Sequence, residues 1–388
     1  MVVWSVLVAS PASAQTAPPH QHAPPPPASG WQWTPAANTF IGQNDQFRKF
    51  TDFHAFESQN WFMLDAARRV GRGSFSVTGM MSFEALTMRR LGSPQVFQTG
   101  EILDRAPLID YQHPHDVLMH LGARFDRPIG GAAMYVGLAL VGEPTLGPPV
   151  FMHRASAAIN PQVPLGHHYL DSTHITTGVV SAGIRRGAIG VEASWFRGRE
   201  PDEDRWDIDL GRLDSWAVRG TWTSGPWSAQ ISGAHLTVPE AVEPFDMTRL
   251  TASVSFTREE GDHPFAVTLA WGQNREFYGT FSTGLLEAVW RLQPRWQMYA
   301  RGELVQKNIL TAGGLHPIGQ THPHTYSRLG ALTIGARRDL LTRSRLSLGL
   351  GGDVTGYLVP ENLLDNYGSP WSTHVFLHVA WIGHRHGR

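Results

Sequence analysis

The feature that most constrains the fold of this 388-residue chain is an alternation of apolar and polar residues with a period of two. Residues 250–257, for example, read Leu-Thr-Ala-Ser-Val-Ser-Phe-Thr. Because residues i and i+2 of an extended strand point to the same side, such a segment has one apolar face and one polar face. The alternation recurs along the chain and predicts an all-β protein.

About fifteen segments carry this alternation. They occupy residues 58–70, 74–87, 116–127, 130–142, 174–185, 188–199, 213–223, 226–237, 249–258, 264–271, 281–292, 295–305, 327–338, 343–357 and 371–381. Most are longer than the roughly five or six residues typical of strands in soluble sheets. A tilted strand needs about nine to eleven residues to cross a bilayer, so these lengths favour a transmembrane barrel.

The connections between the segments alternate strictly between short and long. The short connections fall at residues 71–73, 127–130, 186–187, 224–225, 259–262, 293–294 and 340–342. The long connections fall at residues 88–115, 143–173, 200–212, 238–247, 273–280, 308–326 and 358–370. Barrels of the outer membrane have short periplasmic turns and long extracellular loops, so this pattern indicates such a barrel.

The order of the connections also predicts the strand count. If the turn at residues 71–73 is periplasmic, the strand before it descends, and an ascending strand must precede it. Residues 36–47 are the only segment with room for that strand. We therefore expect a single-domain, antiparallel up-and-down barrel over residues 31–383 with about sixteen strands, 14 or 18 being the alternatives.

The composition excludes several other classes of protein. Charged residues make up 17% of the chain, whereas a soluble enzyme normally carries about a quarter. The chain also lacks the apolar runs of about 18 residues that mark membrane-spanning helices. The balance of 32 basic and 33 acidic residues disfavours nucleic-acid binding by bulk charge. The absence of cysteine excludes disulfides and thiolate metal sites.

The two faces of the strands differ in chemistry. The apolar face carries seven tryptophans, mostly near strand ends: Trp222, Trp227, Trp271, Trp290, Trp296, Trp371 and Trp381. This placement is typical of aromatic girdles at the two membrane interfaces; in a soluble sandwich, the alternative, they would be core residues. The polar face carries charges of both signs, which we expect to line the lumen: Asp65, Arg69, Glu84, Arg124, Glu192, Arg219, Glu287, Arg291, Arg301 and Glu303.

The N-terminal residues predict export. Residues 1–14 combine a short apolar stretch with Ala12-Ser13-Ala14, an A-x-A cleavage pattern, and are expected to be a signal peptide. The Lys/Arg-rich segment with which a signal peptide usually begins is missing, so we expect that residue 1 lies inside a longer signal peptide. Residues 15–30 form a proline-rich linker, which argues against a buried N-terminal strand. Residues 384–388 form a His/Arg tail.

Two blocks in the first long loop point to a family. They are Ser93–Glu101, which reads SPQVFQTGE, and Pro107–Asp116, which reads PLIDYQHPHD. With these blocks and the architecture of Trp31–Gly383, the chain resembles porin-like outer-membrane β-barrel proteins of Gram-negative bacteria. The resemblance implies location in the outer membrane, contact with its lipid and lipopolysaccharide, and insertion by the barrel-assembly machinery. It also implies small solutes as cargo and a homo-oligomer.

Histidine is over-represented, with 19 residues. The pairs His113/His115 and His322/His324 each flank a proline at the end of a long loop, and His120, His374 and His378 have the inward phase. These seven are the candidate ligands for Cu or Zn, since imidazole suits both metals. Met63, Met80 and Met152 are candidate thioether ligands for Cu⁺, while Met119 has the outward phase and is expected to face lipid. The alternative is that the histidines are polar loop and lumen residues bonded to carboxylates.

Two further patterns suggest chemistry less specifically. Residues 202–209 are rich in aspartate, which suits Ca²⁺, although a solvated acidic loop paired with nearby arginines is the alternative. Asp171, Ser172 and His174 are the residue types of a hydrolase triad, but they lie too close in sequence to converge. No G-x-S-x-G elbow is present, and we expect no enzymatic activity.

Two functions remain. In the first, the barrel is a porin-like channel for passive or facilitated diffusion of small solutes, constricted by loop 88–115 or loop 143–173. In the second, it is a histidine-rich, metal-binding barrel with a plugged lumen.

Overall fold

The computed structural model describes residues 30–104, 106–241, 244–261, 263–308, 310, 326–343 and 345–381. The predicted signal peptide, the linker up to residue 29 and the C-terminal His/Arg tail lie outside the described residues. The predicted ligands His322 and His324 lie outside them as well.

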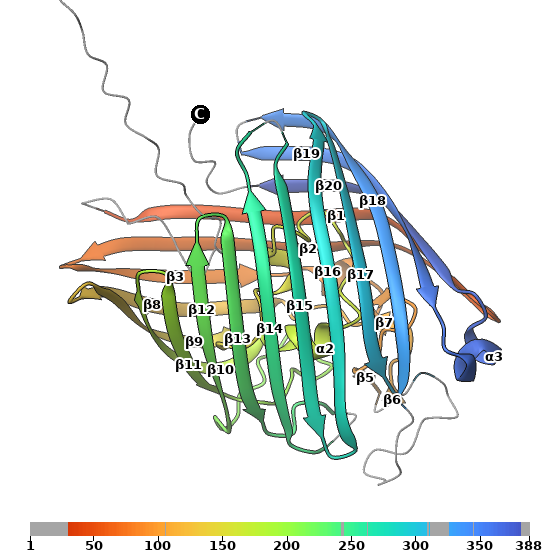
Figure 1. The fold of residues 1–388 in the computed structure, drawn as a ribbon, viewed down its shortest axis with the longest axis horizontal. Helices are drawn as coiled ribbons and strands as arrows, with labels where there is room; N and C mark the ends of the chain where they lie inside the picture. The colour runs from red at the N-terminus through yellow and green to blue at the C-terminus, as the bar shows by residue number, and fades with distance from the viewer. Residues whose placement is uncertain are drawn as a thin grey trace, which may run out of the picture.

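Sixteen long strands of the described chain close into one antiparallel barrel, in which the first strand pairs with the last (Figure 1). The strands are β1 (Gln32–Arg48), β2 (Thr51–Val70), β3 (Gly73–Met81), β8 (Leu118–Ile129), β9 (Ala132–Gly142), β10 (Thr176–Arg186), β11 (Ile189–Phe196), β12 (Ser215–Ser224), β13 (Trp227–Leu236), β14 (Met247–Arg258), β15 (Phe265–Glu276), β16 (Gly279–Gln293), β17 (Trp296–Lys307), β18 (Ser327–Arg343), β19 (Leu346–Leu358) and β20 (Trp371–Trp381). Their order around the barrel follows the chain. The predicted up-and-down barrel of sixteen strands is confirmed, and the alternatives of 14 and 18 are wrong.

The remaining elements are short and lie in the connections. They are the strands β4 (Ser93–Pro94), β5 (Ile102–Leu103), β6 (Ala106–Pro107) and β7 (Tyr111–Gln112), and the helices α1 (Glu84–Thr87), η1 (Phe151–His153), α2 (His167–Leu170), η2 (Ser172–His174), η4 (Glu361–Leu363) and α3 (Leu364–Tyr367). None of the described helices is long and apolar enough to cross a membrane.

The apolar face of the strands points outward. On β14, Leu250 and Val254 are 45% and 43% exposed, whereas Thr251 between them is fully buried. The seven tryptophans of the predicted girdles are all between 40% and 47% exposed. Exposure of so many large apolar side chains is stable only where lipid covers them, so the soluble sandwich is wrong.

Two connections break the expected alternation of short and long. β15 and β16 are joined by a tight turn at Phe277-Tyr278, so the predicted long loop at residues 273–280 is wrong. The polar residues before this turn continue the strand; Asn274, for example, is 1% exposed and faces inward. β1 and β2 are also joined by a tight turn, at Lys49-Phe50.

The predicted strand over residues 74–87 ends early, at Met81. Glu84 is therefore not a strand residue of the lumen but the first residue of α1, which lies against β2. The Glu84 carboxylate accepts a hydrogen bond from the backbone N–H of Asn60 at 3.2 Å. It thus gives a hydrogen-bond partner to a backbone group of β2 that β3, which ends at Met81, is too short to reach.

Met119 is buried rather than lipid-facing, with 2% exposure. Met80 pairs with His120 and Met81 with Leu118, so Met119 is the extra residue of a β-bulge. A bulge interrupts the period-two phase, which is why the outward phase predicted for Met119 is wrong.

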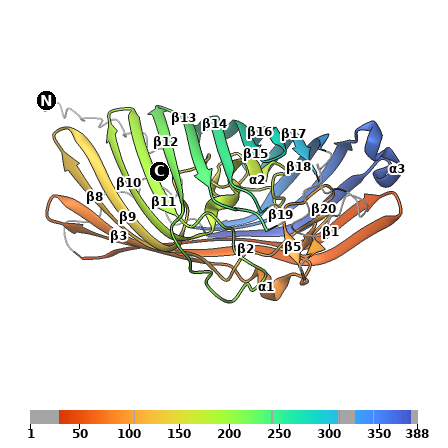
Figure 2. The same cartoon turned by 90° about the horizontal axis from the view of Figure 1, so that it is seen from below.

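The core of the molecule sits inside the barrel, where two long loops fold inward. We call residues 82–117 loop A and residues 143–175 loop B. Both views show α2, from loop B, between the walls of the barrel (Figures 1 and 2). Phe97 of loop A, Tyr169 of loop B and Tyr367 of α3 pack together with wall residues of β17 and β18.

Candidate functional site in the lumen

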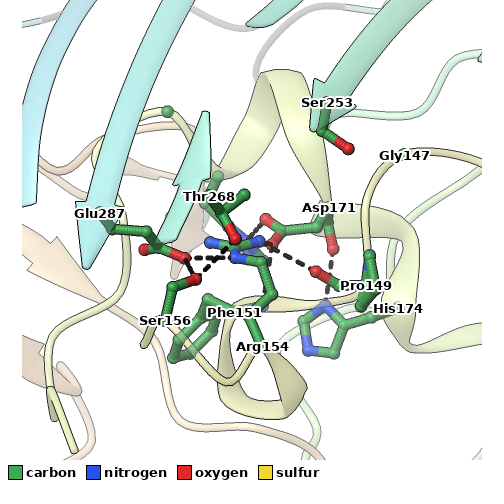
Figure 3. A network of polar contacts seen from close by, with 12 residues as sticks. Gly147, Pro149, Phe151, Arg154, Ser156, Asp171, His174, Ser253, Thr268 and Glu287 are labelled. Carbon is green, nitrogen blue, oxygen red and sulfur yellow. Dashed lines mark hydrogen bonds and ion pairs between the residues drawn. The ribbon is translucent and has the colours of Figure 1, made fainter. Parts of the chain in front are cut away.

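A network of buried ion pairs holds loop B to the wall formed by β15–β17 (Figure 3). The Arg154 guanidinium donates through Nε to Glu287 Oε1 on β16 at 2.6 Å, and through Nη1 to Asp171 Oδ2 at 2.6 Å. Arg301 on β17 donates through Nε to the other Glu287 oxygen at 3.1 Å. All four residues are at most 3% exposed. Such a network is stabilising only while every charge keeps its partner.

Neutral groups complete this network. Ser156 Oγ lies 2.7 Å from Thr268 Oγ1 on β15 and donates to Glu287 at 3.0 Å. Asp171 accepts from the Phe151 N–H at 2.9 Å and lies 2.7 Å from His167 Nδ1. Burial opposes ionisation of Asp171, but Arg154 and His167 outweigh it and hold the pKa of this carboxyl well below its usual range.

Further contacts extend the anchoring of loop B along the wall. Arg219 on β12 donates to the Gly147 carbonyl at 3.2 Å, and Arg249 on β14 donates to Ser172 Oγ at 3.0 Å. Arg301 also donates to the Gln162 carbonyl at 2.7 Å. Loop B is therefore fastened to a continuous arc of the wall from β12 to β17.

The residues predicted to line the lumen do not lie together at one place. Glu192, Arg219, Glu287, Arg301 and Glu303 face loop B or pair with wall residues that do. Three others bond within the wall: Asp65 to Thr78, Arg124 to Asp126, and Arg291 to Asp339. Arg69 is exposed near the end of β2, and Glu84 belongs to α1. Pore lining by this set stays a prediction.

Another side of the lumen, against β1, β2 and β20, is incompletely filled. Two adjoining cavities there contain about 660 and 200 Å³ of space without atoms, part of it open to solvent, and share Phe40, Gln59 and Pro161; we call them together the recess. Side-chain amides are the most numerous polar groups of its lining: Gln43, Asn44, Asn38, Gln59, Asn60, Gln95, Gln112, Asn160 and Gln162. The lining also includes the carboxylates of Glu57 and Glu84 and the imidazoles of His113, His115 and His374. Aromatic rings of Phe40, Trp61, Phe151 and Phe376 lie between them.

Five histidines from loops A and B form a row of neighbouring rings. The ring centroids of His115 and His174 are 5.3 Å apart, those of His174 and His167 5.2 Å, and those of His167 and His168 5.6 Å. His113 of loop A joins this row through Glu101, which lies 2.7 Å from His113 Nε2 and 3.3 Å from His168 Nε2. The structure thus brings two of the predicted ligands, His113 and His115, to loop B histidines outside the predicted set.

Of the other predicted metal ligands, the three within the described residues lie elsewhere. His374 Nδ1 lies 2.8 Å from Asp353, and His378 Nε2 lies 2.5 Å from Asn38 and its ring stacks on Phe40. His120 pairs with Met80 at the bulge of β8. The five predicted ligands that the structure describes therefore do not surround one point, and metal binding by the seven stays a prediction.

His115 and Glu84 form a buried pair at the base of loop A. Glu84 Oε2 accepts from the His115 N–H at 3.0 Å and lies 2.8 Å from His115 Nδ1. Burial disfavours charge on both groups, but their mutual attraction outweighs it. The pair therefore raises the pKa of His115 and lowers the pKa of Glu84.

Three other candidate sites can be placed. Met63, Met80 and Met119 are buried in one apolar cluster against which Met152 packs, so the structure does bring these methionines together. Asp202, Asp207 and Asp209 offer carboxylate oxygens within 4.8 Å of one another in the exposed loop predicted for Ca²⁺. Asp171, Ser172 and His174 have no triad geometry, because Ser172 Oγ accepts from Arg249 and His174 Nδ1 bonds to the Asp171 carbonyl at 2.9 Å.

Sequence reasoning missed Arg154, Glu101 and Glu240, and it did not single out the amides of the recess. One signal was available for Arg154: it is the single arginine of loop B, among many apolar and proline residues. A lone arginine in so apolar a loop suggests a buried, paired cation.

Comparison with known proteins supports the same architecture. No protein-family model matches the chain, and no curated protein matches it either. Among solved structures, it is similar to the anion-selective porin from Comamonas acidovorans, with a TM-score of 0.54, 11% identity, and coverage of 91% of this chain and 100% of that porin. It is also similar to a loop L8 deletion mutant of OmpT, an outer membrane protein of Vibrio cholerae, with a TM-score of 0.51, 8% identity, and coverage of 90% and 99%. At these identities the similarity shows the fold.

Proposed function

The chain is a porin-like outer-membrane β-barrel by fold, and we propose that it is a narrow channel for small, uncharged solutes that form hydrogen bonds. The observation that carries this proposal is the recess. The space that loops A and B leave open lies along β1, β2 and β20 and is lined mainly by amides and aromatic rings.

The distribution of charge supports an uncharged solute. The buried charges of the lumen on the β15–β17 side are paired with one another, as in Arg154–Glu287 and Arg154–Asp171. A narrow path selective for ions uses rings of one sign or backbone carbonyls to replace the hydration shell. In the recess, amides outnumber the two carboxylates, Glu57 and Glu84, and each amide both donates and accepts hydrogen bonds.

The aromatic lining narrows the class of solute further. Trp61 and Phe40 contribute apolar ring faces beside the amides of Gln59 and Asn60. Alternating apolar faces and hydrogen-bonding groups complement a small polyhydroxylated solute, which has C–H faces and hydroxyl edges. The Gln162 amide nitrogen, which is buried and without a hydrogen-bond partner, offers such a solute a free donor.

Two measurements on the purified protein test the proposal. In planar bilayers we expect small, stable conductance steps, because loops A and B occupy most of the lumen. In proteoliposome swelling we expect uptake of small neutral polyols to be faster than uptake of a charged solute of the same size. Vesicles without protein provide the baseline.

A loop variant separates a narrow channel from a closed barrel. Replacing residues 147–173 with a short glycine-serine segment should raise the conductance several-fold, because loop B and its anchors are removed. The proposal is wrong if the intact protein gives neither conductance nor swelling while the shortened variant gives both, since loop B would then be a complete plug.

A further inference from the structure

Three carboxylates surround one imidazole outside the ion-pair network. Glu101 comes from loop A, His168 from α2 in loop B, Glu200 from the connection after β11, and Glu240 from the connection after β13. The last two connections lie side by side, since the Glu200 N–H donates to the Pro239 carbonyl at 2.9 Å. We call these four residues the carboxylate cluster.

The distances within the cluster suit ligands of one ion. His168 Nε2 lies 3.3 Å from Glu101, and Nδ1 lies 3.7 Å from Glu200 and 3.5 Å from Glu240. Glu101, His168 and Glu200 each offer a ligand atom within 4.8 Å of the others. Two donors bound tetrahedrally to Zn²⁺ at about 2.0–2.2 Å lie roughly 3.4 Å apart. The separations from Nδ1 to Glu200 and to Glu240 are close to that value, while Glu101 lies beside the other ring nitrogen, Nε2.

The imidazole is buried and lacks hydrogen bonds. His168 is 5% exposed, and neither of its ring nitrogens has a hydrogen-bond partner. Glu200 Oε1 is also buried without a partner. A buried polar atom in a native protein is normally hydrogen-bonded. The ring nitrogens of His168 have only ion-pair contacts, so the nitrogen that faces Glu200 and Glu240 can take a further ligand.

The chain packs closely around the imidazole, which fixes its position. A Cβ added to Gly100 would lie 2.7 Å from His168 Nε2, so only glycine allows this approach of loop A to the ring. The neighbouring Glu101 is itself held by His113, whose Nε2 lies 2.7 Å from Glu101 Oε1. Such an outer partner orients a carboxylate that faces a ligand histidine.

The four side chains of the cluster are three carboxylates and one imidazole. The nearest buried cations donate elsewhere, Lys307 to Gln98 and Arg249 to Ser172 and Asn274.

We propose that the carboxylate cluster of Glu101, His168, Glu200 and Glu240 holds one divalent transition-metal ion such as Zn²⁺, with His168 and the carboxylates on one side of its ring as the ligands. His168 gives the ion one ring nitrogen, and the carboxylate that faces its other nitrogen accepts the remaining N–H. The ion joins loops A and B to the connections after β11 and β13, so it fastens both inward-folded loops to the rim of the barrel. This site is independent of the proposed solute path.

Isothermal titration calorimetry of the EDTA-treated protein with ZnCl₂ tests the site. We expect one binding event that is clearly tighter than weak binding to the many other histidines. H168Q and E200Q should each weaken that event by more than about tenfold, as loss of a ligand or of its orienting partner does. Bilayer conductance is not part of this readout, so a failed channel proposal leaves the test intact.

Matched controls separate the cluster from other acidic and histidine groups. H263A and E259Q remove exposed residues near the turn between β14 and β15, and D207N alters the exposed acidic loop. All three should titrate like the natural protein. The proposal is overturned if H168Q and E200Q also titrate like it, or if D207N alone abolishes the tight event.

Stability without metal distinguishes a metal site from a structural ion pair. E200Q removes one of three mutually repelling carboxylates, so the metal-free variant should be at least as stable as the metal-free natural protein. It should no longer be stabilised by added Zn²⁺, whereas the natural protein should be. If metal-free E200Q is instead clearly less stable, and Zn²⁺ stabilises both proteins equally, Glu200 serves only to pair with His168 and the proposal fails.

Discussion

The two sides of the lumen are filled in different ways. On the β15–β17 side, Arg154, Asp171, Glu287 and Arg301 are buried and each charge is paired. On the β1–β2–β20 side, amides and aromatic rings, with the carboxylates of Glu57 and Glu84 among them, line incompletely filled space. Buried charges require fixed partners, whereas amides exchange one partner for another at small cost. The first side is suited to holding loop B in place, and the second to admitting a solute.

The largest effect is expected from Arg154→Ala on the charged side. The change leaves Asp171 and Glu287 as buried carboxylates without their shared cation, which costs about 3–5 kcal/mol. Native-state hydrogen exchange of the amides of loop B should accelerate accordingly, and bilayer conductance should rise as the loop detaches. The reference variant is Arg124→Ala, whose ion pair with Asp126 is partly exposed and should contribute less than about 1 kcal/mol.

A second substitution tests whether the loss of ion pairing causes the faster exchange of loop B in Arg154→Ala. In Arg154→Ala/Glu287→Gln, one of the two uncompensated charges is removed, so part of the lost protection should return. Equal exchange rates in the single and double variants would show that Arg154 acts through packing. The two sides of the lumen would then not differ by the pairing of buried charges.

A smaller effect is expected from pH, through the Glu84–His115 pair at the base of loop A. The raised pKa of His115 contributes stability below the ordinary value of 6.5 that is lost as the pH rises through the folded-state pKa. The lowered pKa of Glu84 contributes stability above the ordinary value of 4.5 that is lost as the pH falls through its folded-state pKa. Loop A should be most protected between these two values.

Limited proteolysis of loop A by trypsin across this pH range measures the effect. H115Q should remove the loss of protection on the alkaline side, because the glutamine does not titrate. Asp116 and Arg205 also act on His115, so D116N is the appropriate control for a general change in charge. An unchanged pH profile in H115Q would assign the dependence to another histidine of the row.

The smallest effect is expected from Trp61→Ala in the recess. The Trp61 ring lines the recess, and its centroid is 4.9 Å from that of His153. Its removal should widen the path, with a modest rise in conductance and faster swelling with larger polyols. Trp195→Ala removes an outward-facing ring that is 55% exposed and should change neither the conductance nor the swelling rate. Loss of conductance in Trp61→Ala would contradict a path through the recess.

The wall of the barrel could be predicted from sequence because its signal is local. A period of two, short turns and one missing strand before residue 58 were enough for the strand count and the topology. The errors occur where the local pattern is interrupted. The bulge at Met119 reverses the phase, and the polar end of β15 resembles a loop.

The contents of the lumen could not be predicted in the same way, because their contacts are remote in sequence. Arg154 and Glu287 are 133 residues apart, and no alternation relates them. The histidine pair of loop A was visible as a motif, but its neighbours His168 and His174 became apparent only once loop B was seen to fold inward. Side chains from separate loops meet through the fold, which a single sequence does not encode locally.

The seam between β1 and β20 has a consequence for the order in which the molecule is assembled. It joins the two ends of the barrel, and the contact between Asn38 and His378 spans 340 residues. Contacts of such separation carry the largest loop-closure entropy and are expected to form late. Loops A and B precede most of the strands that enclose them, so they are expected to be packed while the sheet is still an open, curved ribbon. The interior would then be assembled with the wall, rather than threaded into a finished cylinder.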